Sequence, residues 1–443
     1  MNTLFPVDKT VYAETPDNRL VRAELRLSDR WKVVGKHVDM VCEERSDDVP
    51  EFDVVSAAQL RSRQHTSRGC VEIFVSAQPG QRYRCPVCGC SCKPLCYEVR
   101  RYHHLPEQGC ECWIIARIPK LICRGCGGTP QVPFPLSDRR ASYTRDLAEE
   151  VMSSLTSRSR SSVASDLFIS TDIVDSILDR QITDAMKEQD LSHVSGVFLD
   201  ETQYGHGQDY ISVFLDQNHK VIYACRGHGK DVLERFCGHL ILQGGDPGNI
   251  RFFSTDMSTA YESGILEHFR NAILVWDRFH LIKSLNEALN NVRKRTLKRA
   301  SGESLKSVKY VVLKHFQNQT PEQEEKMSQI RMVNPELAIA FDMKEVFSDI
   351  ILIRDRNSMA AMLKWWIGWV ESEGPKEFVD KVRWIREKIG RILDWAIFPI
   401  SNSASEGVNK NIQDIRRQAC GYRNVQNFFQ MIFLRQSELE FRF

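Results

Sequence analysis

Three acidic residues stand where metal-dependent phosphodiester chemistry would need them. Asp200 ends an apolar run that predicts a strand, and Asp256 ends another. If these strands are parallel neighbours in a sheet, both carboxylates reach the same edge, where open α/β sheets bind ligands. Glu406 lies on a predicted helix that can pack across that edge. Cleavage and transfer of a phosphodiester use two hard cations about 4 Å apart. We therefore expect Asp200, Asp256 and Glu406 to bind two Mg²⁺ or Mn²⁺ ions.

Other interpretations are open for Asp200 and Asp256 as metal ligands. Asp256 is also placed to cap the helix predicted after it. Glu201 is a rival ligand beside Asp200, although strand alternation points it to the other face of the sheet. Asp277 follows a further predicted strand and competes with Asp256 for the second metal position. Strand order favours Asp256.

Two Cys-x-x-Cys pairs predict a second kind of metal site. Cys85 and Cys88 form one pair, Cys123 and Cys126 form the other, and a glycine directly follows each pair. Zinc prefers four thiolates in a tetrahedron, and two such knuckles supply them. Because four thiolates leave no open coordination position, we expect a structural zinc ion. A second metal or an exchange of ligands stays open because five more cysteines lie nearby: Cys90, Cys92, Cys96, Cys110 and Cys112.

A change of hydrophobic period near Val194 marks the elements that must position the carboxylates. Three apolar runs predict an antiparallel meander, and helices and strands then alternate as far as Trp276. This order indicates a mixed α/β sheet. Residues 281–398 lack strand signals and predict an all-helical insertion, and residues 399–443 predict closing helices. The predicted strands are 194–199, 210–215, 220–225, 250–255 and 272–276.

Two smaller regions precede this core, which begins at residue 193 and is interrupted after residue 280. Residues 81–135 predict the zinc-binding module, and residues 136–192 predict a helix-turn-helix domain. Its second helix, Thr171–Arg180, would be capped by Ser170 or Thr171. That helix is not very basic, so a helical linker bundle is the alternative. Residues 1–80 are poorly readable, apart from a candidate strand at Val71–Val75.

Basic and aromatic residues gather close to the predicted site. Such a basic run is often only a solvated face, but its place beside the carboxylates favours contacts with phosphates. Trp365 and Trp369 share a helical face, whereas Trp366 points elsewhere and is expected to be the more exposed. The basic residues expected to bind DNA are Arg293, Lys294, Arg295, Lys298, Arg416, Arg417 and Arg423.

Composition adds little about partners but bears on location. The net charge of +2 over 443 residues is too small to argue for nucleic acid by itself. The first residues show no signal peptide, and no apolar run approaches the roughly 18 to 20 residues that span a bilayer. We therefore expect a cytoplasmic, soluble protein without membrane contact, whose 14 cysteines stay reduced.

Together these residues resemble a known family, the transposases of the ISL3 group of insertion sequences. The resemblance runs from about Cys85 to the C-terminus, and its most specific part is the string Ser401–Asn409 with Gly421–Asn424 after it. It implies an RNase H-like fold with an acidic triad at Asp200, Asp256 and Glu406. It also implies an accessory Asp-x-x-His motif at Asp277 and His280, although His280 has the alternative of holding a helix start. The helical stretch between His280 and Glu406 resembles the insertion domain of such enzymes.

The resemblance implies a bacterial, nucleoid-associated DNA transposase. Such an enzyme binds the terminal inverted repeats of its insertion sequence, cleaves the strand at the element end and joins it to target DNA. Two ends must be held together, so we expect a homodimer or a higher oligomer on DNA. Two alternatives stay open: a catalytically inactive zinc and helix-turn-helix DNA-binding regulator, and an RNase H-like nuclease that cannot transfer strands.

Overall fold

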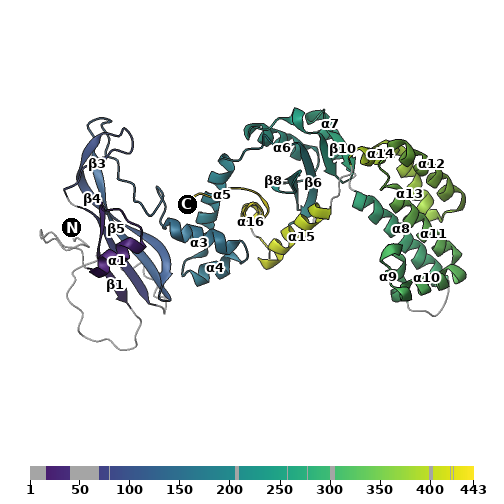
Figure 1. Cartoon of the computed structure of the whole chain (residues 1–443), viewed down its shortest axis with the longest axis horizontal. Helices are drawn as coiled ribbons and strands as arrows, with labels where there is room; N and C mark the ends of the chain where they lie inside the picture. Colours follow the sequence, from purple (N-terminus) through teal and green to yellow (C-terminus); the bar gives the residue numbers. More distant parts are fainter. Residues whose placement is uncertain are drawn as a thin grey trace. The chain divides into compact units, whose positions relative to one another are not determined.

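The computed structural model describes most of the chain, which divides into two compact units (Figure 1). The first unit contains residues 1–185 and 440–443, and the second contains residues 186–439. Asp277 and Arg423 lie outside the described residues, as does the side chain of Lys298. The described residues are 16–39, 69–78, 80–204, 209–256, 258–276, 278–299, 305–398, 403–419, 421–422 and 424–443.

A five-stranded sheet forms the core of the first unit, in the order β1-β2-β5-β4-β3. β2 runs parallel to β5, and the other neighbours are antiparallel. The strand expected at Val71–Val75 is confirmed, and it lies in the same sheet as the long β4–β5 hairpin that follows the first cysteine knuckle. Every second residue of β2, such as Val71, Ile73 and Val75, is buried in one hydrophobic cluster with residues of β5. Helix α1, Pro16–Glu24, contacts β1, and its Val21 packs against this cluster. The strands are β1 Trp31–Asp39, β2 Cys70–Ala77, β3 Tyr83–Arg84, β4 Ser91–Glu107 and β5 Cys110–Ile122.

Three helices follow this sheet within the first unit: α3 Arg145–Leu155, α4 Arg160–Asp166 and α5 Thr171–Lys187. The Ser170 hydroxyl accepts the Ile173 N–H at 3.3 Å, so Ser170 caps α5 as predicted. α5 buries Val174, Ile177 and Leu178 at helical spacing. Its exposed side chains include three acidic residues, Asp172, Asp179 and Asp184. An acidic exposed face repels phosphates, which favours the linker-bundle alternative for this helix.

A second five-stranded sheet forms the core of the second unit, in the order β10-β9-β6-β7-β8 (Figure 1). β6, β7 and β8 are an antiparallel meander, whereas β9 and β10 extend the sheet in parallel with β6. Aromatic rings from the sheet and its covering helices fill the core, with Phe214 stacked on Phe236 at 4.3 Å. The predicted mixed sheet is confirmed. Its elements are β6 Gly196–Gln203, β7 Tyr210–Asp216, β8 Val221–Arg226, α6 Lys230–Leu242, η1 Pro247–Asn249, β9 Phe252–Thr255, α7 Thr259–His268 and β10 Ile273–Trp276.

Between β10 and residue 398, the described residues form helices and short connections, as the sequence predicts. Two of these helices begin at a proline in the first turn, a position where the missing N–H costs nothing. The expectation that Trp366 is exposed is wrong. Its side chain is fully buried and its indole N–H donates to the Met343 carbonyl at 2.8 Å, whereas Trp365 is 53% exposed. The helices are α8 Arg278–Arg299, α9 Leu305–Val312, η2 Phe316–Asn318, α10 Pro321–Val333, α11 Pro335–Ile350, α12 Arg356–Glu373, α13 Lys376–Glu387 and α14 Ile389–Ile397.

Two helices end the second unit: α15 Ser403–Gln418 contacts β6, and α16 Val425–Gln436 contacts β8. Ile412 and Ile415 of α15 are buried, so one side of this helix packs inward, as its pattern predicts. Of the helices described, none combines the length and apolar character needed to cross a membrane.

Candidate functional site

The register of the second sheet brings Asp200 and Asp256 to neighbouring positions. Phe198 of β6 pairs with Ser254 of β9 in parallel register. Asp200 stands two residues beyond Phe198 within β6, and Asp256 stands two residues beyond Ser254, directly after the last residue of β9. Adjacent strands of a sheet lie about 4.8 Å apart. The prediction that Asp200 ends its strand is wrong, since β6 continues to Gln203. It does so because β7 stays paired with it, whereas β9 stops at Thr255.

Asp200 and Glu201 point to opposite faces of the sheet. The Glu201 carboxylate accepts a hydrogen bond from the Tyr261 hydroxyl on α7. Burial, and then this carboxylate, raise the pKa of Tyr261 well above its ordinary value, so the phenol remains a donor. Asp200 instead accepts hydrogen bonds from the Asn409 amide on α15 and, at 2.7 Å, from the Glu201 backbone N–H. The rival ligand Glu201 is therefore turned towards α7, away from α15.

Helix α15 follows β6 through successive polar contacts. After Asn409, the Gln413 amide donates to the Thr202 hydroxyl, and the Arg416 guanidinium donates to the Gln203 carbonyl at 2.8 Å. Glu406 precedes Asn409 by three residues, so it lies on the same side of α15 one turn earlier, and it is exposed. The predicted helix-borne glutamate thus lies one turn from the contact with Asp200.

Asp256 also accepts a hydrogen bond just before the following helix. Its Oδ1 accepts the Ser258 backbone N–H at 3.1 Å, and Ser258 is the residue before the first turn of α7. This bond closes a turn ahead of the helix, whose N-cap residue is Ser258 and not Asp256. A carboxylate offers about four acceptor positions, so this bond does not exhaust the capacity of Asp256 for a cation.

The three predicted acidic residues are not gathered as closely as the cysteines of the first unit. Among the described residues, Asp200, Asp256 and Glu406 do not form a group whose ligand atoms all lie within 4.8 Å of one another. Two cations about 4 Å apart do not require that, because each carboxylate needs to reach only its own ion or the shared edge. Two buried oxygens next to these carboxylates also lack a hydrogen-bond partner, Thr255 Oγ1 and Asn409 Oδ1.

The accessory pair is described only in part. Asp277 lies outside the described residues, and His280 lies half-buried in the first turn of α8. The Asp-x-x-His motif therefore stays a prediction.

Two of the arginines expected to bind DNA are engaged inside the protein. Arg293 is 6% exposed and its guanidinium donates to Asn290 on the same helix. Arg295 donates to Glu336 and Glu377, at 2.5 and 2.8 Å, and thereby ties α8 to α11 and α13. These contacts argue against phosphate binding by either side chain, since a phosphate at Arg295 would have to displace both glutamates. Lys294 between them is exposed.

The two arginines near the end of α15 differ in how exposed their side chains are. Arg416 is half-buried against β6, as described above, whereas Arg417 is exposed and pairs with Asp414 on its own helix. An exposed pair of this kind contributes little to stability, so Arg417 can exchange Asp414 for a phosphate.

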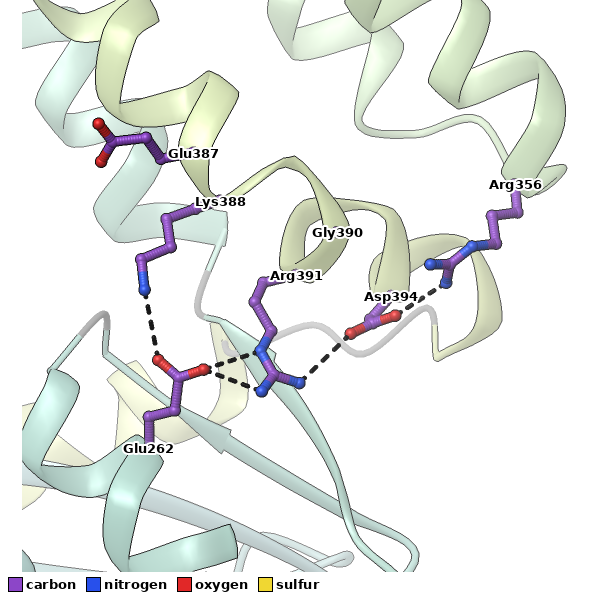
Figure 2. Close-up of a pocket in the computed structure, with 7 residues that line it drawn as sticks. All are labelled: Glu262, Arg356, Glu387, Lys388, Gly390, Arg391 and Asp394. Carbon is purple, nitrogen blue, oxygen red and sulfur yellow. Dashed lines mark hydrogen bonds and ion pairs between the residues drawn. The ribbon is translucent and has the colours of Figure 1, made fainter.

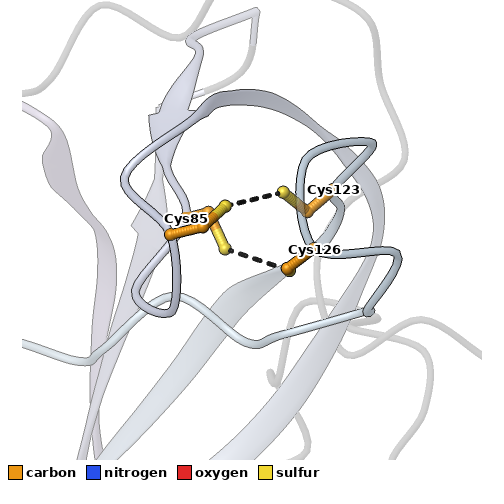
Figure 3. A group of neighbouring side chains, drawn as sticks. Cys85, Cys123 and Cys126 are labelled. Carbon is orange, nitrogen blue, oxygen red and sulfur yellow. Dashed lines mark hydrogen bonds between the residues drawn. The ribbon is translucent and has the colours of Figure 1, made fainter.

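The four predicted cysteines of the first unit come together (Figure 3). Their Sγ atoms all lie within 4.8 Å of one another, with Cys85 to Cys126 at 3.8 Å and Cys88 to Cys123 at 3.4 Å. Tetrahedral zinc with Zn–S bonds of about 2.3 Å separates its sulfurs by about 3.8 Å. The donor set therefore fits one zinc ion.

The turns of the two knuckles explain why glycine follows each pair. Gly89 and Gly127 have φ of 75° and 70°, a region that side chains disfavour. The first turn is closed by the Gly89 N–H to the Cys85 carbonyl at 2.9 Å, and the Val87 N–H donates to Cys85 Sγ at 3.4 Å. Such N–H donors stabilise a thiolate.

The additional cysteines form no further metal group among the described residues. Cys110 and Cys112 are buried in the first sheet, and Cys96 is exposed. Cys92 is buried and donates to the Cys90 carbonyl at 3.3 Å.

A charged cavity of about 390 Å³ lies where α7 meets the helical insertion (Figure 2). Glu262 of α7 pairs with Arg391 at 2.8 Å and with Lys388 at 3.5 Å, and Asp394 pairs with Arg356 at 2.8 Å. Burial raises the pKa of Glu262, but Arg391 and Lys388 outweigh it and hold this pKa below its ordinary value. The two ion pairs of Glu262 fix the insertion to α7, whereas the Asp394–Arg356 pair lies within the insertion.

A second contact fixes the insertion to the end of β10. The Trp395 indole of α14 donates to the Trp276 carbonyl at 2.6 Å, and both residues are buried. Trp384 of α13 stacks on the Trp276 ring at 5.4 Å. The insertion therefore contacts the sheet at the same edge as the acidic residues.

We expect a double-mutant cycle with Glu262→Gln and Arg391→Gln to give a coupling of about 1 kcal/mol at pH 7, because the pair is only partly exposed. Since the folded-state pKa of Glu262 is lowered, this coupling is present above the unfolded pKa of about 4.3 and is lost as the pH falls through the folded value. Urea unfolding at pH 7 and pH 3 measures it. The more exposed pair Arg386–Glu371 is the control and should couple more weakly. A pH-independent or zero coupling at Glu262 contradicts this assignment.

The sequence placed Asn409 and Gln413 beside Glu406 but did not predict their contacts. The signal was their shared helical face. Their partners on β6 depend on how α15 lies along a strand about two hundred residues earlier, which no local pattern encodes. The contact from Trp395 to Trp276 was missed for the same reason.

The chain is similar to known transposases over the region that holds the acidic residues. The model of a family described as transposase, the ISL3 type of DDE transposases, matches residues 197–432. The transposase for insertion sequence element IS1001 of Bordetella parapertussis is 24% identical over 356 residues, which cover 78% of this chain and 86% of the relative. The transposase for insertion sequence element IS1557 of Mycobacterium tuberculosis is 23% identical over 367 residues, which cover 76% and 81%. The matched family region spans β6 to α16.

Proposed function

Because the chain belongs to the ISL3 family of DDE transposases, we propose that it binds the terminal inverted repeats of an insertion sequence and carries out metal-dependent strand cleavage and strand transfer. The observation that supports this most is the contact of α15 with Asp200, one turn from Glu406, beside a β6–β9 register that leads to Asp256. Three carboxylates from distant parts of the chain then share one edge of one sheet.

The core is proposed to be RNase H-like. In its favour, an antiparallel meander is extended by two parallel strands that are reached through helices, in the order β10-β9-β6-β7-β8. Such a sheet places β6 at its centre, so Asp200 stands on the central strand. The helical insertion between β10 and α15 also agrees with the proposal.

Asp200, Asp256 and Glu406 are the residues that would hold two Mg²⁺ or Mn²⁺ ions. When bound, these ions stabilise the attacking and the leaving oxygen of a phosphodiester. The protein's own part is to fix the carboxylates: hydrogen bonds from Asn409 and the Glu201 backbone orient Asp200, and the Ser258 backbone N–H orients Asp256. Hydrolysis frees a 3′-hydroxyl at the element end, and this hydroxyl then displaces a 3′-oxygen of the target strand. Asp277 and His280 remain proposed accessory residues.

The DNA is proposed to lie along the exposed basic residues near this edge. Lys294 and Arg417 have exposed side chains, and Arg416 reaches β6. Arg423 and Lys298 stay in the proposal on the sequence alone. Phosphate contacts position the duplex, so recognition of the inverted repeats is assigned to the zinc module that precedes the helical segment. Because two ends must be joined together, the active form is proposed to be a dimer or a higher oligomer.

Strand transfer is the test of this function. Precut DNA carrying the element's end and a supercoiled target should give joined products with Mg²⁺ or Mn²⁺ and none with a chelator. Gel analysis of labelled ends measures the products. Cleavage of an uncut end without joining of the precut end would identify a nuclease instead, and end binding with neither reaction would identify a regulator.

A further inference from the structure

Asn409 contacts a proposed metal-binding carboxylate from the helix that carries Glu406. Its Nδ2 donates to Asp200 Oδ2, while the Glu201 backbone N–H donates to Oδ1 at 2.7 Å. Both oxygens of Asp200 are thereby oriented, from α15 on one side and from the strand itself on the other. A neutral amide can donate in this way without adding charge to a site that must hold cations.

The same side chain carries a polar atom for which the described part of the chain offers no hydrogen-bond partner. Asn409 Oδ1 is buried and has no hydrogen-bond partner. Buried acceptors are nearly always paired, so an orphan beside an acidic cluster indicates a donor or a cation that binds there. Thr255 Oγ1, on the residue before Asp256, is orphaned in the same way.

Asn409 also links α15 to β6. Glu406 and Asn409 are three residues apart on α15, and Gln413 continues the contact to β6 at Thr202. Among the bonds from α15 to β6, the one from Asn409 lies nearest in sequence to Glu406. Together with the Ser405 hydroxyl, which contacts the His219 ring at 3.0 Å, this bond holds α15 on either side of Glu406.

From these contacts we infer that Asn409 is a positioning residue: it orients Asp200, sets the approach of Glu406, and offers Oδ1 to the bound cation or to a water in its shell. This inference rests on the proposed function. It assigns a role to the amide that neither aspartate nor an aliphatic residue can fill, since the first adds a negative charge and the second removes both polar groups.

Binding of Mn²⁺ alone to the full-length protein, followed by the electron paramagnetic resonance signal of the free ion, tests the inference without relying on activity. Asn409→Leu should weaken Mn²⁺ binding about 10- to 100-fold, the range found for residues that orient metal ligands. Asn411→Leu is the matched control, because Asn411 lies on the same helix but contacts Gln436. It should bind Mn²⁺ like the wild type.

Further variants and measurements separate the possible outcomes of this test. Thermal unfolding reports folding, and Asn409→Ser repeats the test with a small polar residue if the leucine variant does not fold. In strand cleavage, Asn409→Leu and Asn409→Ser should lower kcat and leave the affinity for end DNA unchanged. If Asp200→Asn loses Mn²⁺ and Asn409 variants with wild-type melting bind it normally, the role of Asn409 is overturned and the proposed function stands. If the wild type binds no Mn²⁺, the metal site itself is wrong.

Discussion

Replacing Asp200, Asp256 or Glu406 with the corresponding amide should lower the rate of Mg²⁺-dependent cleavage at element ends by about 10³-fold, since each change removes several kcal/mol of metal-mediated stabilisation. The amides keep the size of each side chain, so the fold should persist. Cleavage of labelled end DNA measures the rate. Mobility shift in Ca²⁺ measures binding, which should change little.

Glu201→Gln is the matched control for this series. It removes a charge one residue from Asp200, on a side chain that faces Tyr261 and α7. The account predicts cleavage within about tenfold of the wild type, a change of no more than about 1.4 kcal/mol. A Glu201 variant as inactive as Asp200→Asn, or any triad variant that cuts normally, would show that the site is wrongly assigned.

Removal of zinc should unfold the knuckle end of the first unit. Zinc binding to structural thiolate sites amounts to about 10–16 kcal/mol at neutral pH in small domains, which exceeds the total stability of most domains. Two of the four ligands, Cys85 and Cys123, are buried with the first sheet. We therefore expect chelation or Cys123→Ser to lower the melting temperature of this unit sharply and to abolish recognition of the inverted repeats.

Zinc content and calorimetry check this prediction. The wild type should carry one zinc per chain, and Cys96→Ser, which changes an exposed cysteine outside the four-sulfur group, should carry the same. A Cys123→Ser protein with full zinc would point to a replacement ligand such as Cys90 or Cys92. Unchanged melting after chelation would show that the cluster has no structural role.

The sheet that carries the site was predictable from hydrophobic pattern. Apolar runs ending near Asp200 and Asp256 alternate with helical segments, and this order alone requires a mixed sheet. The end of β6 was not predictable, because the pairing of Thr202 and Gln203 with β7 decides it. The four zinc-site cysteines were predictable from spacing, since each knuckle is a local turn.

Features that depend on distant partners were missed. Arg295 appeared to belong to a basic surface, but Glu336 and Glu377 from two later helices enclose it. Trp366 appeared exposed because its burial depends on α11, which supplies the Met343 carbonyl. Within residues 1–80 the strand at Val71–Val75 was predicted, but β1 was missed, since its partner β2 comes about thirty residues later in the chain.

Anomalous scattering from Mn²⁺ in crystals of the protein bound to its end DNA tests the central claim most directly. The account predicts two peaks about 4 Å apart, with oxygens of Asp200, Asp256 and Glu406 as ligands at roughly 2.0–2.2 Å. A metal pair held by Asp277 in place of Asp256, or a Glu406 carboxylate remote from both ions, would contradict it.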